Sequence, residues 1–474
     1  MGKKIKRKLE EPHVFVNFEK ILIDKFDSNI SVLNFLRNHR DLVGTKEGCS
    51  EGDCGACSVL IYDKELKYSP INSCILKVGQ IIGKNIITVE GISQLKNSES
   101  LLSSLYDQGA SQCGFCTPGF VIAAAALKIE QPKVNEKQVH DGLSGNLCRC
   151  TGYRPIIDAI LETKEKIIIP NPKKKQNVFG SKLNFGKTTF FYPRSANDIR
   201  KLLASGKDFT PLAGGTDWNL ESADQDFDKH DILFLSEIDE MKDIKRKKNS
   251  IEFGASVTLK RFENFCLKYL PTVTETINRF GSPQIRSAAT IGGNIATSSP
   301  IGDLAPIFLV MGAKLHILGK KGLRKILLKD FYIGYRKNKL KSKEIIFKIE
   351  LPKLGKKQKV FSWKLSKRYD QDISTISLAA KIEVEKGEKI NDVILAAGGV
   401  AATPTIMEKT SLAIRNRKIN SLNNDLLLDL SKDINPISDL RGTAEYRKNA
   451  MLGLIEKMQT SLRDDEAPKS IMSF

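Results

Sequence analysis

The chain has 474 residues, of which 41% are hydrophobic and 27% charged, a length and composition that suit about three or four globular domains. No apolar run reaches the roughly 18 residues that a membrane-spanning helix needs, so a membrane protein is not expected. The net charge of +20 is spread over scattered lysines and the aromatic fraction is only 7%, so we expect solvated basic faces or an acidic partner rather than nucleic-acid binding.

The N-terminal segment predicts the compartment and the first elements. MGKKIKRKLEEPHVFV is basic but no apolar stretch typical of a secretory signal follows it, so a cytoplasmic protein with reduced cysteines is expected. HVFVNFEKILIDKF alternates apolar and polar residues around a short turn and predicts a β-hairpin. SVLNFLRNH then predicts an amphipathic helix.

Eight of the nine cysteines lie in two groups of four. The first group combines a Cys-x4-Cys-x2-Cys run with a more distant partner: Cys49, Cys54, Cys57 and Cys74. This spacing is typical of a plant-type two-iron, two-sulfur (2Fe-2S) cluster, although four thiolates also suit structural zinc. The surrounding glycines favour the cluster, because a loop with positive φ angles can aim backbone N–H groups at sulfur.

The second group consists of Cys113, Cys116, Cys148 and Cys150. Its spacing alone fits zinc and iron–sulfur equally well. Thr117 followed by Pro118 predicts the N-cap and first residue of a buried helix, and further helices are expected from Asn135 and over RPIIDAILETKEK. The thiols would then lie at helix ends, where free N–H groups stabilise negative charge. The ninth cysteine, Cys266, lies in an apolar pattern and is interpreted as a core thiol.

Polar loops rich in glycine form a second informative region. A stretch rich in proline, glycine and lysine from about Ile169 predicts a linker. Beyond it, DFTPLAGGTDWNLE predicts a short strand and a Gly-Gly turn suited to a pyrophosphate, although an ordinary tight turn is the alternative. The loop at 280–306 lies between apolar elements and suits a phosphate-rich or polyhydroxylated ligand, with Asp303 available to accept a hydrogen bond from a hydroxyl.

Three motifs carry a resemblance to one family. GCSEGDCGAC, QCGFCTPGF and LSGNLCRCTGYRPI are similar to the iron–sulfur region of the molybdenum hydroxylases, the xanthine dehydrogenase and aldehyde oxidase family. The resemblance implies that both cysteine groups bind 2Fe-2S clusters. It also implies a multidomain α+β fold with a β-grasp ferredoxin-like 2Fe-2S domain at 12–90, a helical 2Fe-2S-binding domain at 91–168, a linker at 169–184, a two-part α+β FAD-binding domain at 185–353 and an α/β C-terminal flavoprotein domain at 360–463.

The same resemblance implies which residues bind FAD. The loop that would wrap the pyrophosphate comprises Pro211, Leu212, Ala213, Gly214, Gly215, Thr216, Asp217 and Trp218. Phe280 would lie against the isoalloxazine, and the residues that would hydrogen-bond the cofactor are Thr290, Asn294, Thr297 and Asp303. Ile346 and Lys364 would contact the flavin, where a cation offsets the negative charge of the reduced ring. A surface lysine is the alternative interpretation of Lys364.

By this resemblance the chain conducts electrons and has no catalytic residue of its own. The electrons would pass from a molybdopterin cofactor on a large partner subunit through the second cysteine group, then the first, to FAD and finally NAD. The assembly would be a heterodimer or a dimer of heterodimers. The implied substrates are hypoxanthine and xanthine, with aldehydes, carbon monoxide or an aromatic acyl-CoA as alternatives. A zinc-stabilised scaffold protein is the alternative from a different class.

Overall fold

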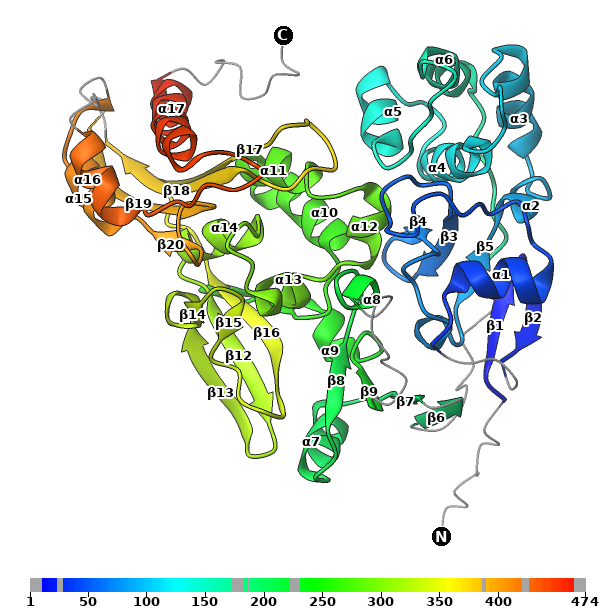
Figure 1. Cartoon of the computed structure of the whole chain (residues 1–474), viewed down its shortest axis with the longest axis horizontal. Helices are drawn as coiled ribbons and strands as arrows, with labels where there is room; N and C mark the ends of the chain where they lie inside the picture. Colours follow the sequence, from blue (N-terminus) through cyan, green and yellow to red (C-terminus); the bar gives the residue numbers. More distant parts are fainter. Residues whose placement is uncertain are drawn as a thin grey trace. The chain divides into compact units, whose positions relative to one another are not determined.

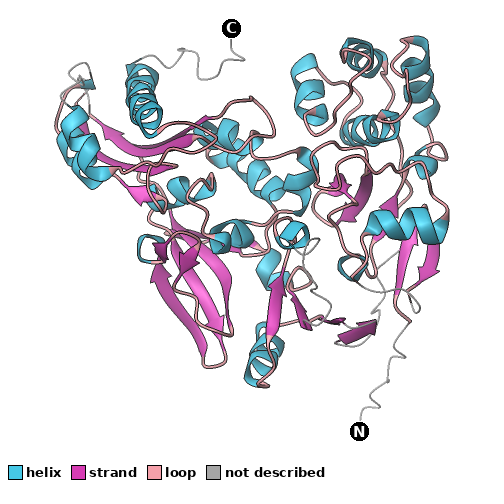
Figure 2. Ribbon diagram, in the orientation of Figure 1, coloured by secondary structure: helices cyan, strands magenta, loops and turns pink. Residues whose placement is uncertain are grey.

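The computed structural model describes residues 11–23, 29–172, 182–185, 188–221, 231–385, 389–419 and 426–463. Contacts divide the chain into two compact units. Unit 1 contains residues 1–195, 207–238 and 282–289, and unit 2 contains residues 196–206, 239–281 and 290–474. Helices and strands occur in both units, so the chain is a multidomain α+β protein, as expected (Figures 1 and 2).

A five-stranded sheet with the order β2-β1-β5-β3-β4 forms the N-terminal part of unit 1. β1 is antiparallel to β2 and parallel to β5, so the predicted hairpin is confirmed. Helix α1 begins after Ser31, whose hydroxyl accepts a hydrogen bond from the Asn34 N–H at 3.1 Å. The elements are β1 (His13–Val16), β2 (Glu19–Leu22), α1 (Val32–Arg40), β3 (Ser58–Asp63), β4 (Lys67–Asn72), the 3-10 helix η1 (Val78–Gln80) and β5 (Asn85–Ile87).

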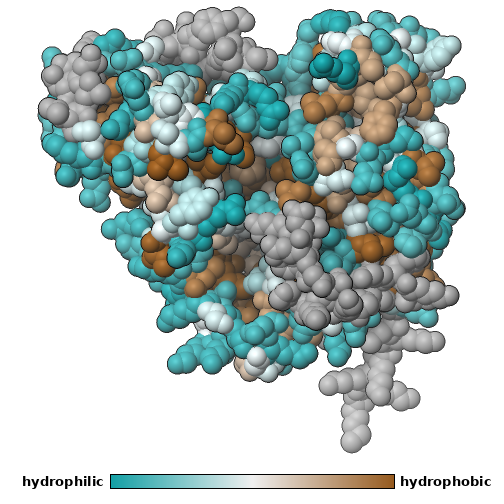
Figure 3. All heavy atoms as spheres, in the orientation of Figure 1, coloured by the Kyte–Doolittle hydropathy of each residue, from teal (hydrophilic) through white to brown (hydrophobic). Residues whose placement is uncertain are grey.

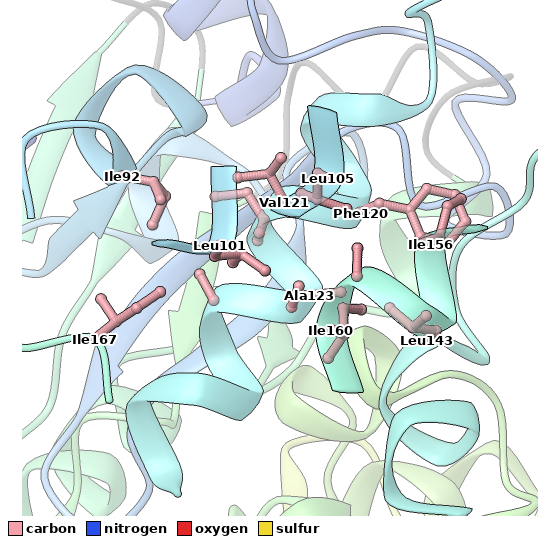
Figure 4. Packing of buried hydrophobic residues seen from close by; sticks show 14 of the residues in the cluster. Ile92, Leu101, Leu105, Phe120, Val121, Ala123, Leu143, Ile156, Ile160 and Ile167 are labelled. Atoms are coloured by element: carbon pink, nitrogen blue, oxygen red, sulfur yellow. The ribbon is translucent and has the colours of Figure 1, made fainter. Parts of the chain in front are cut away.

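Five helices follow in unit 1 and enclose an apolar core. Leu101, Phe120 and Ile160 belong to this core and come from three different helices (Figure 4). Burial of these side chains supplies most of the stability of such short helices, which are marginal alone. The helices are α2 (Val89–Ile92), α3 (Ser98–Asp107), α4 (Thr117–Glu130), α5 (Glu136–Leu143) and α6 (Arg154–Glu162).

The helix boundaries correct the sequence expectations in detail. Cys116, not Thr117, is the N-cap of α4, so Pro118 occupies the second helical position. Proline is tolerated there because the N–H groups of the whole first turn have no intrahelical acceptor. The predicted start of α5 is confirmed by a capping box between Asn135 and Gln138. Helix α6 ends at Glu162, earlier than the RPIIDAILETKEK pattern predicted.

A four-stranded sheet with the order β6-β7-β9-β8 completes unit 1. Phe190 and Phe234 from this sheet share one apolar core with Val14 and Ile86 of the N-terminal sheet. Residues 182–184, predicted as the end of the linker, begin β6, whereas 173–181 lie outside the described residues. The elements are β6 (Lys182–Phe185), β7 (Thr188–Phe191), β8 (Phe209–Leu212), α8 (Trp218–Glu221), β9 (Asp231–Phe234) and α12 (Pro283–Ala288).

Unit 2 begins with an antiparallel sheet of order β10-β11-β16-β12-β13. Phe253 of this sheet packs edge-to-face on Phe262, which meets Phe308 in the same way. The elements are α7 (Ala196–Ala204), α9 (Asp239–Lys242), β10 (Ile244–Arg246), β11 (Ser250–Gly254), α10 (Leu259–Tyr269), η2 (Pro271–Val273), α11 (Thr274–Asn278), α13 (Ile291–Thr297), α14 (Leu304–Val310), β12 (Lys314–Gly319), β13 (Gly322–Leu327), η3 (Leu328–Asp330), β14 (Tyr332–Gly334), β15 (Lys337–Asn338) and β16 (Glu344–Pro352).

The C-terminal part of unit 2 is an antiparallel sheet of order β17-β18-β19-β20 with helices against it. Its core joins strand residues such as Leu378 and Leu395 to Met451 of the last helix. Figure 3 shows hydrophilic residues mixed with smaller hydrophobic groups on the visible face. Among the described helices, none is long and apolar enough to cross a bilayer. The elements are β17 (Gln358–Leu365), β18 (Ile376–Val384), β19 (Ile390–Gly398), β20 (Thr405–Ile406), α15 (Glu408–Ile414), α16 (Leu426–Asp433) and α17 (Ala444–Arg463).

Candidate functional site

Backbone donors converge on Cys49 in the loop between α1 and β3. Its Sγ accepts hydrogen bonds from the N–H groups of Glu51, Asp53 and Cys54 at 3.4, 3.3 and 3.4 Å. A hydrogen bond from the Cys54 side chain and these N–H groups lower the pKa of Cys49 to about 4, against the opposing effect of partial burial. The loop therefore stabilises negative charge on this sulfur.

The other two cysteines of the first group lie beside this loop. Cys57 Sγ lies 3.2 Å from Cys74 Sγ, and Asn72 Nδ2 lies 3.8 Å from Cys57 Sγ. Hydrogen bonding with Cys74 lowers the pKa of Cys57 to about 7, although Cys57 is buried at 2% exposure. Negative charge on Cys49 also acts to raise the pKa of Cys57 and of Cys74. The thiols of the first group are therefore near enough to interact electrostatically.

Glycine conformation shapes the first cysteine loop. Gly52 and Gly55 have φ angles of +84° and +71°, as predicted for the glycines of this loop, whereas the same prediction is wrong for Gly44 and Gly48, which do not have positive φ. A Cβ at Gly48 would lie 2.7 Å from Cys54 Sγ, and one at Gly55 would clash with the Gly145 carbonyl. Substitution at these glycines would therefore displace the ligand loop.

The second group lies in the loops that precede α4 and α6. Cys150 Sγ donates to Cys113 Sγ at 3.6 Å, and both residues are exposed. Cys148 Sγ lies 3.2 Å from Thr151 Oγ1 and accepts from the Thr151 N–H at 3.5 Å. Burial raises the pKa of Cys116 to about 12, with a further contribution from its hydrogen bond to Cys148. The predicted position of these thiols at helix ends is confirmed at Cys116, the N-cap of α4.

The donor chemistry of both groups fits an iron–sulfur cluster. Each presents four thiols with close sulfur–sulfur approaches, and deprotonated thiols at such range repel each other unless cations bind between them. Cys266 differs, because it is fully buried in α10 and burial together with Glu263 raises its pKa. It has the character of a core thiol, as predicted.

The Gly-Gly turn joins β8 to α8 within unit 1. Gly215 has a φ of +78°, and a Cβ at Gly214 would clash with the Ala288 carbonyl. Gln80 Nε2 donates to Gly214 O at 3.2 Å, and Asn219 Nδ2 donates to Gln80 Oε1 at 2.9 Å. Buried partners hold this turn, and the absence of Cβ atoms lets its backbone approach neighbouring groups closely. The close approach at both glycines is to groups of the chain itself, so binding of the pyrophosphate by residues 211–218 stays a prediction.

In unit 2, three residues predicted to hydrogen-bond the cofactor lie on one short helix. Thr290 caps α13 by accepting from the Gly293 N–H at 3.1 Å, and Thr297 Oγ1 donates to Gly293 O at 3.0 Å. Asn294 Oδ1 is buried without a hydrogen-bond partner among the described residues. A buried amide oxygen left in this state requires an explanation, and a bound ligand donor would supply one.

Asp303 and Lys364 form a buried ion pair in unit 2. Lys364 Nζ lies 2.8 Å from Asp303 Oδ2 and also donates to Arg279 O at 3.0 Å. Ser374 Oγ donates to Asp303 Oδ1 at 2.5 Å. The Lys364 side chain is 1% exposed, so the alternative interpretation as a surface lysine is wrong. Asp303 thus accepts from a hydroxyl of the chain itself, and its predicted hydrogen bond with a ligand hydroxyl stays a prediction.

The remaining predicted flavin residues also lie in unit 2. Ile346 in β16 is buried at 5% exposure, and Phe280 is half-buried. Pro211–Trp218 belong to unit 1.

Three further metal-ligating side chains meet on neighbouring strands of unit 2. The ligand atoms of Glu252, His316 and Glu350 lie within 4.8 Å of one another. However, Lys247 Nζ lies 2.6 Å from Glu252 Oε1, and Lys325 Nζ lies 3.3 Å from Glu350 Oε2. The carboxylates are therefore balanced by lysines, and we interpret the group as an ion-paired sheet face.

Three buried amide side chains of unit 1 were missed by sequence reasoning. Gln80 and Asn219 tie the Gly-Gly turn to the segment that follows Cys74, since Asn219 Nδ2 also donates to Ile75 O. Gln284 contacts residues of both cysteine loops. Their partners are distant in sequence, so no local spacing could have revealed them.

Three family models match the chain. They are a [2Fe-2S] binding domain at residues 88–161, an FAD binding domain in molybdopterin dehydrogenase at 183–354, and a CO dehydrogenase flavoprotein C-terminal domain at 361–462. The cysteine groups and the glycine turn thus lie in a chain that contains both a 2Fe-2S-binding and an FAD-binding domain.

Similar proteins include xanthine dehydrogenases and a carbon monoxide dehydrogenase. Xanthine dehydrogenase of Oryza sativa subsp. japonica is 29% identical, covering 94% of this chain and 39% of the relative. That of Emericella nidulans is 28% identical, covering 93% and 38%. The solved structure of a Cu,Mo-CO dehydrogenase, in a cyanide-inactivated form, matches with a TM-score of 0.52 and 25% identity, covering 56% of this chain and 94% of that one. The chain spans about two fifths of the length of these xanthine dehydrogenases.

The fold and the matched domains define an iron–sulfur flavoprotein. The matched domains and relatives support an iron–sulfur and FAD electron-transfer chain similar to those of the molybdenum hydroxylase family.

Proposed function

We propose that the chain is the electron-transfer part, the small iron–sulfur and FAD subunit, of a xanthine dehydrogenase. The observation that carries this proposal is a sulfur–sulfur contact within each predicted set in unit 1, Cys57 with Cys74 at 3.2 Å and Cys113 with Cys150 at 3.6 Å. The similarity to xanthine dehydrogenases over 94% and 93% of this chain supports the substrate class. When bound, the clusters and FAD would supply one- and two-electron chemistry between a molybdopterin-binding partner and NAD as hypoxanthine or xanthine is oxidised to urate.

In this proposal each cysteine group holds one 2Fe-2S cluster. The first is held by Cys49, Cys54, Cys57 and Cys74, and the second by Cys113, Cys116, Cys148 and Cys150. The N–H groups aimed at Cys49 Sγ would offset the negative charge of four thiolates. The domain ranges expected from the sequence and a cytoplasmic location are part of the same proposal.

The exposure of the second group supports electron entry at that end. Cys113 and Cys150 are exposed, and Phe115 and Leu147 beside them in the sequence are 47% and 49% exposed. An apolar rim around accessible thiols suits close approach of a partner surface. The first group, with Cys57 buried, is less accessible.

The flavin-binding part of the proposal assigns roles to each unit. In unit 1, residues 211–218 would present backbone N–H groups to the pyrophosphate. In unit 2, Asn294 would accept a donor through its unpartnered Oδ1. Lys364 would contribute less net positive charge than a lone cation, because Asp303 lies 2.8 Å from its Nζ.

A second candidate is a carbon monoxide dehydrogenase. The solved Cu,Mo-CO dehydrogenase chain and the match of residues 361–462 to the CO dehydrogenase flavoprotein C-terminal domain favour it. Aldehydes and aromatic acyl-CoA remain further substrate classes for the same cofactor chain, and a colourless zinc scaffold is the candidate that lacks redox activity.

The test is an assay of the purified complex. We expect a red-brown protein that dithionite bleaches, about four iron atoms per chain, and NAD reduction that depends on xanthine. Oxidation of carbon monoxide or aldehydes without purine oxidation would transfer the proposal to those substrates and leave the cofactor assignments standing. A colourless protein containing zinc would contradict the whole proposal.

A further inference from the structure

Helix α12 contacts three of the loops proposed to bind cofactors. A Cβ on Gly52 of the first cysteine loop would lie 3.2 Å from Ile285 Cδ1, and one on Gly145 would lie 2.7 Å from Ser282 Cβ. Gly214 of the Gly-Gly turn packs against the Ala288 carbonyl. All of these residues belong to unit 1. One six-residue helix and its cap therefore touch all three loops.

Gln284 is the polar centre of this junction. Its side chain has 0% exposure. Nε2 donates to Ser58 Oγ at 3.2 Å and to Asn146 Oδ1 at 2.9 Å. Ser58 follows Cys57 directly, and Asn146 lies two residues before Cys148. The Gln284 amide thus joins the two cysteine loops.

The two loops also contact each other directly. Leu147 N donates to Cys54 O at 3.0 Å, and Asn146 Nδ2 donates to Gly55 O at 3.3 Å. Leu147 precedes Cys148 in the chain. One hydrogen bond and one peptide unit therefore connect a proposed ligand of the first cluster to a proposed ligand of the second.

The backbone of the first cysteine loop packs closely against its neighbours at two glycines. A Cβ at Gly55 would clash with Gly145 O, and one at Gly119 would clash with Gly55 O. Gln284 Oε1 is buried without a partner among the described residues, which costs stability. An apolar side chain would avoid that cost, so the amide has a use other than filling space.

We propose that Gln284 is a positioning residue that fixes the separation of the two cluster-binding loops and thereby the rate of electron transfer between the clusters. This inference rests on the proposed function, since it requires both clusters. Gln284 itself holds no iron and need not touch the flavin. Its effect arises because electron tunnelling and magnetic coupling depend steeply on the distance between the two centres.

The test substitutes Gln284→Met in the full chain with its partner. Methionine keeps the length of the side chain and removes both donors. We expect unchanged iron and FAD content, transfer between the clusters slowed by roughly tenfold in rapid-mixing reduction, because small misplacements of reacting centres have large rate effects, and weaker splitting between the two reduced clusters in electron paramagnetic resonance. The matched control is Gln108→Met, because Gln108 is a half-buried amide that donates to Glu162 and contacts neither cysteine loop in these bonds.

The outcomes separate the two proposals. Wild-type protein without iron would overturn the proposed function. Wild-type protein with both clusters, together with a Gln284→Met variant that matches Gln108→Met in rate and splitting, would overturn only the positioning role. Loss of iron in Gln284→Met would also overturn the positioning role, because the amide would then be required for the cysteine loops to bind their clusters at all. Asn146→Ser repeats the test from the other partner, and the same slowing is expected.

Discussion

The two cysteine groups of unit 1 solve the same chemical problem with different backbones. The first uses an irregular loop whose glycines adopt left-handed conformations, with Cys57 buried at 2% exposure. In the second, Cys116 is the N-cap of α4, and Cys113 and Cys150 are exposed. The first group therefore depends on the packing around its loop, whereas the second leaves two thiols open to a partner.

The two cysteine groups also differ in the groups that donate hydrogen bonds to sulfur. Cys49 accepts three backbone N–H bonds, whereas Cys148 accepts one from Thr151 beside a hydroxyl contact. We therefore expect the first group to depend on backbone conformation and the second on individual side chains.

The largest difference between the two cysteine groups is expected for the substitutions Gly55→Ala and Gly114→Ala. Both glycines have positive φ angles, +71° and +81°, but only Gly55 packs against backbone, while nothing lies within 4 Å of a Cβ at Gly114. Gly114→Ala should cost about 1 kcal/mol for the left-handed conformation. Gly55→Ala should cost roughly 4 kcal/mol, because overpacking adds to that strain. The unfolding temperature and bound iron measure the difference, and equal losses would show that the first loop is not confined.

A smaller difference is expected between Cys57→Ser and Cys150→Ser. Each should remove one cluster and about half of the iron. Cys57→Ser should cost a further 1–3 kcal/mol or so, because it buries a hydroxyl in a site built for sulfur. Thermal unfolding of the two iron-depleted variants measures this.

Cys266→Ser is the control for burial alone. Cys266 is fully buried and is not a proposed ligand, so the variant should be destabilised and keep its full iron content. Loss of iron from it would mean that the assignment of the eight ligands is incomplete.

The smallest effect is expected for Thr151→Val in the second group. The substitution removes the hydroxyl 3.2 Å from Cys148 Sγ and keeps the backbone N–H. Losing about 1 kcal/mol of hydrogen bonding to sulfur should lower the reduction potential of this cluster and leave the other unchanged. Redox titration followed by electron paramagnetic resonance measures both. Thr117→Val is the matched control, because its hydroxyl contacts Ser111 rather than sulfur; an equal shift there would exclude a role for the Thr151 hydroxyl.

Sequence patterns predicted the local features of the fold well. Alternation predicted the β1–β2 hairpin. The helix start expected near Asn135 is confirmed at α5, where Asn135 is the N-cap. The N-cap of α4 was displaced by one residue to Cys116, because proline in the first turn does not fix its own position within that turn. The spacing of the first cysteine group and the family motifs predicted which thiols the structure brings together.

Contacts between distant segments could not be predicted. Gln284 and Asn219 have their partners in other domains of the expected scheme, and a buried glutamine has no periodic signature. The ion pair of Asp303 with Lys364 was missed for the same reason, although both residues were named. The two units also cut across the expected domain ranges, which stay a prediction, because Phe190, Leu212 and Phe234 share a core with the N-terminal sheet.

That shared core limits how the protein can be dissected. The chain passes between the units after residues 195, 206, 238, 281 and 289, so no single cut separates them. A fragment ending near residue 168 would carry all eight thiols and still lack Phe190 and Phe234, leaving Val14 and Ile86 partly uncovered. Any attempt to isolate the iron–sulfur half by truncation must therefore carry three later stretches of polypeptide with it, α12 among them.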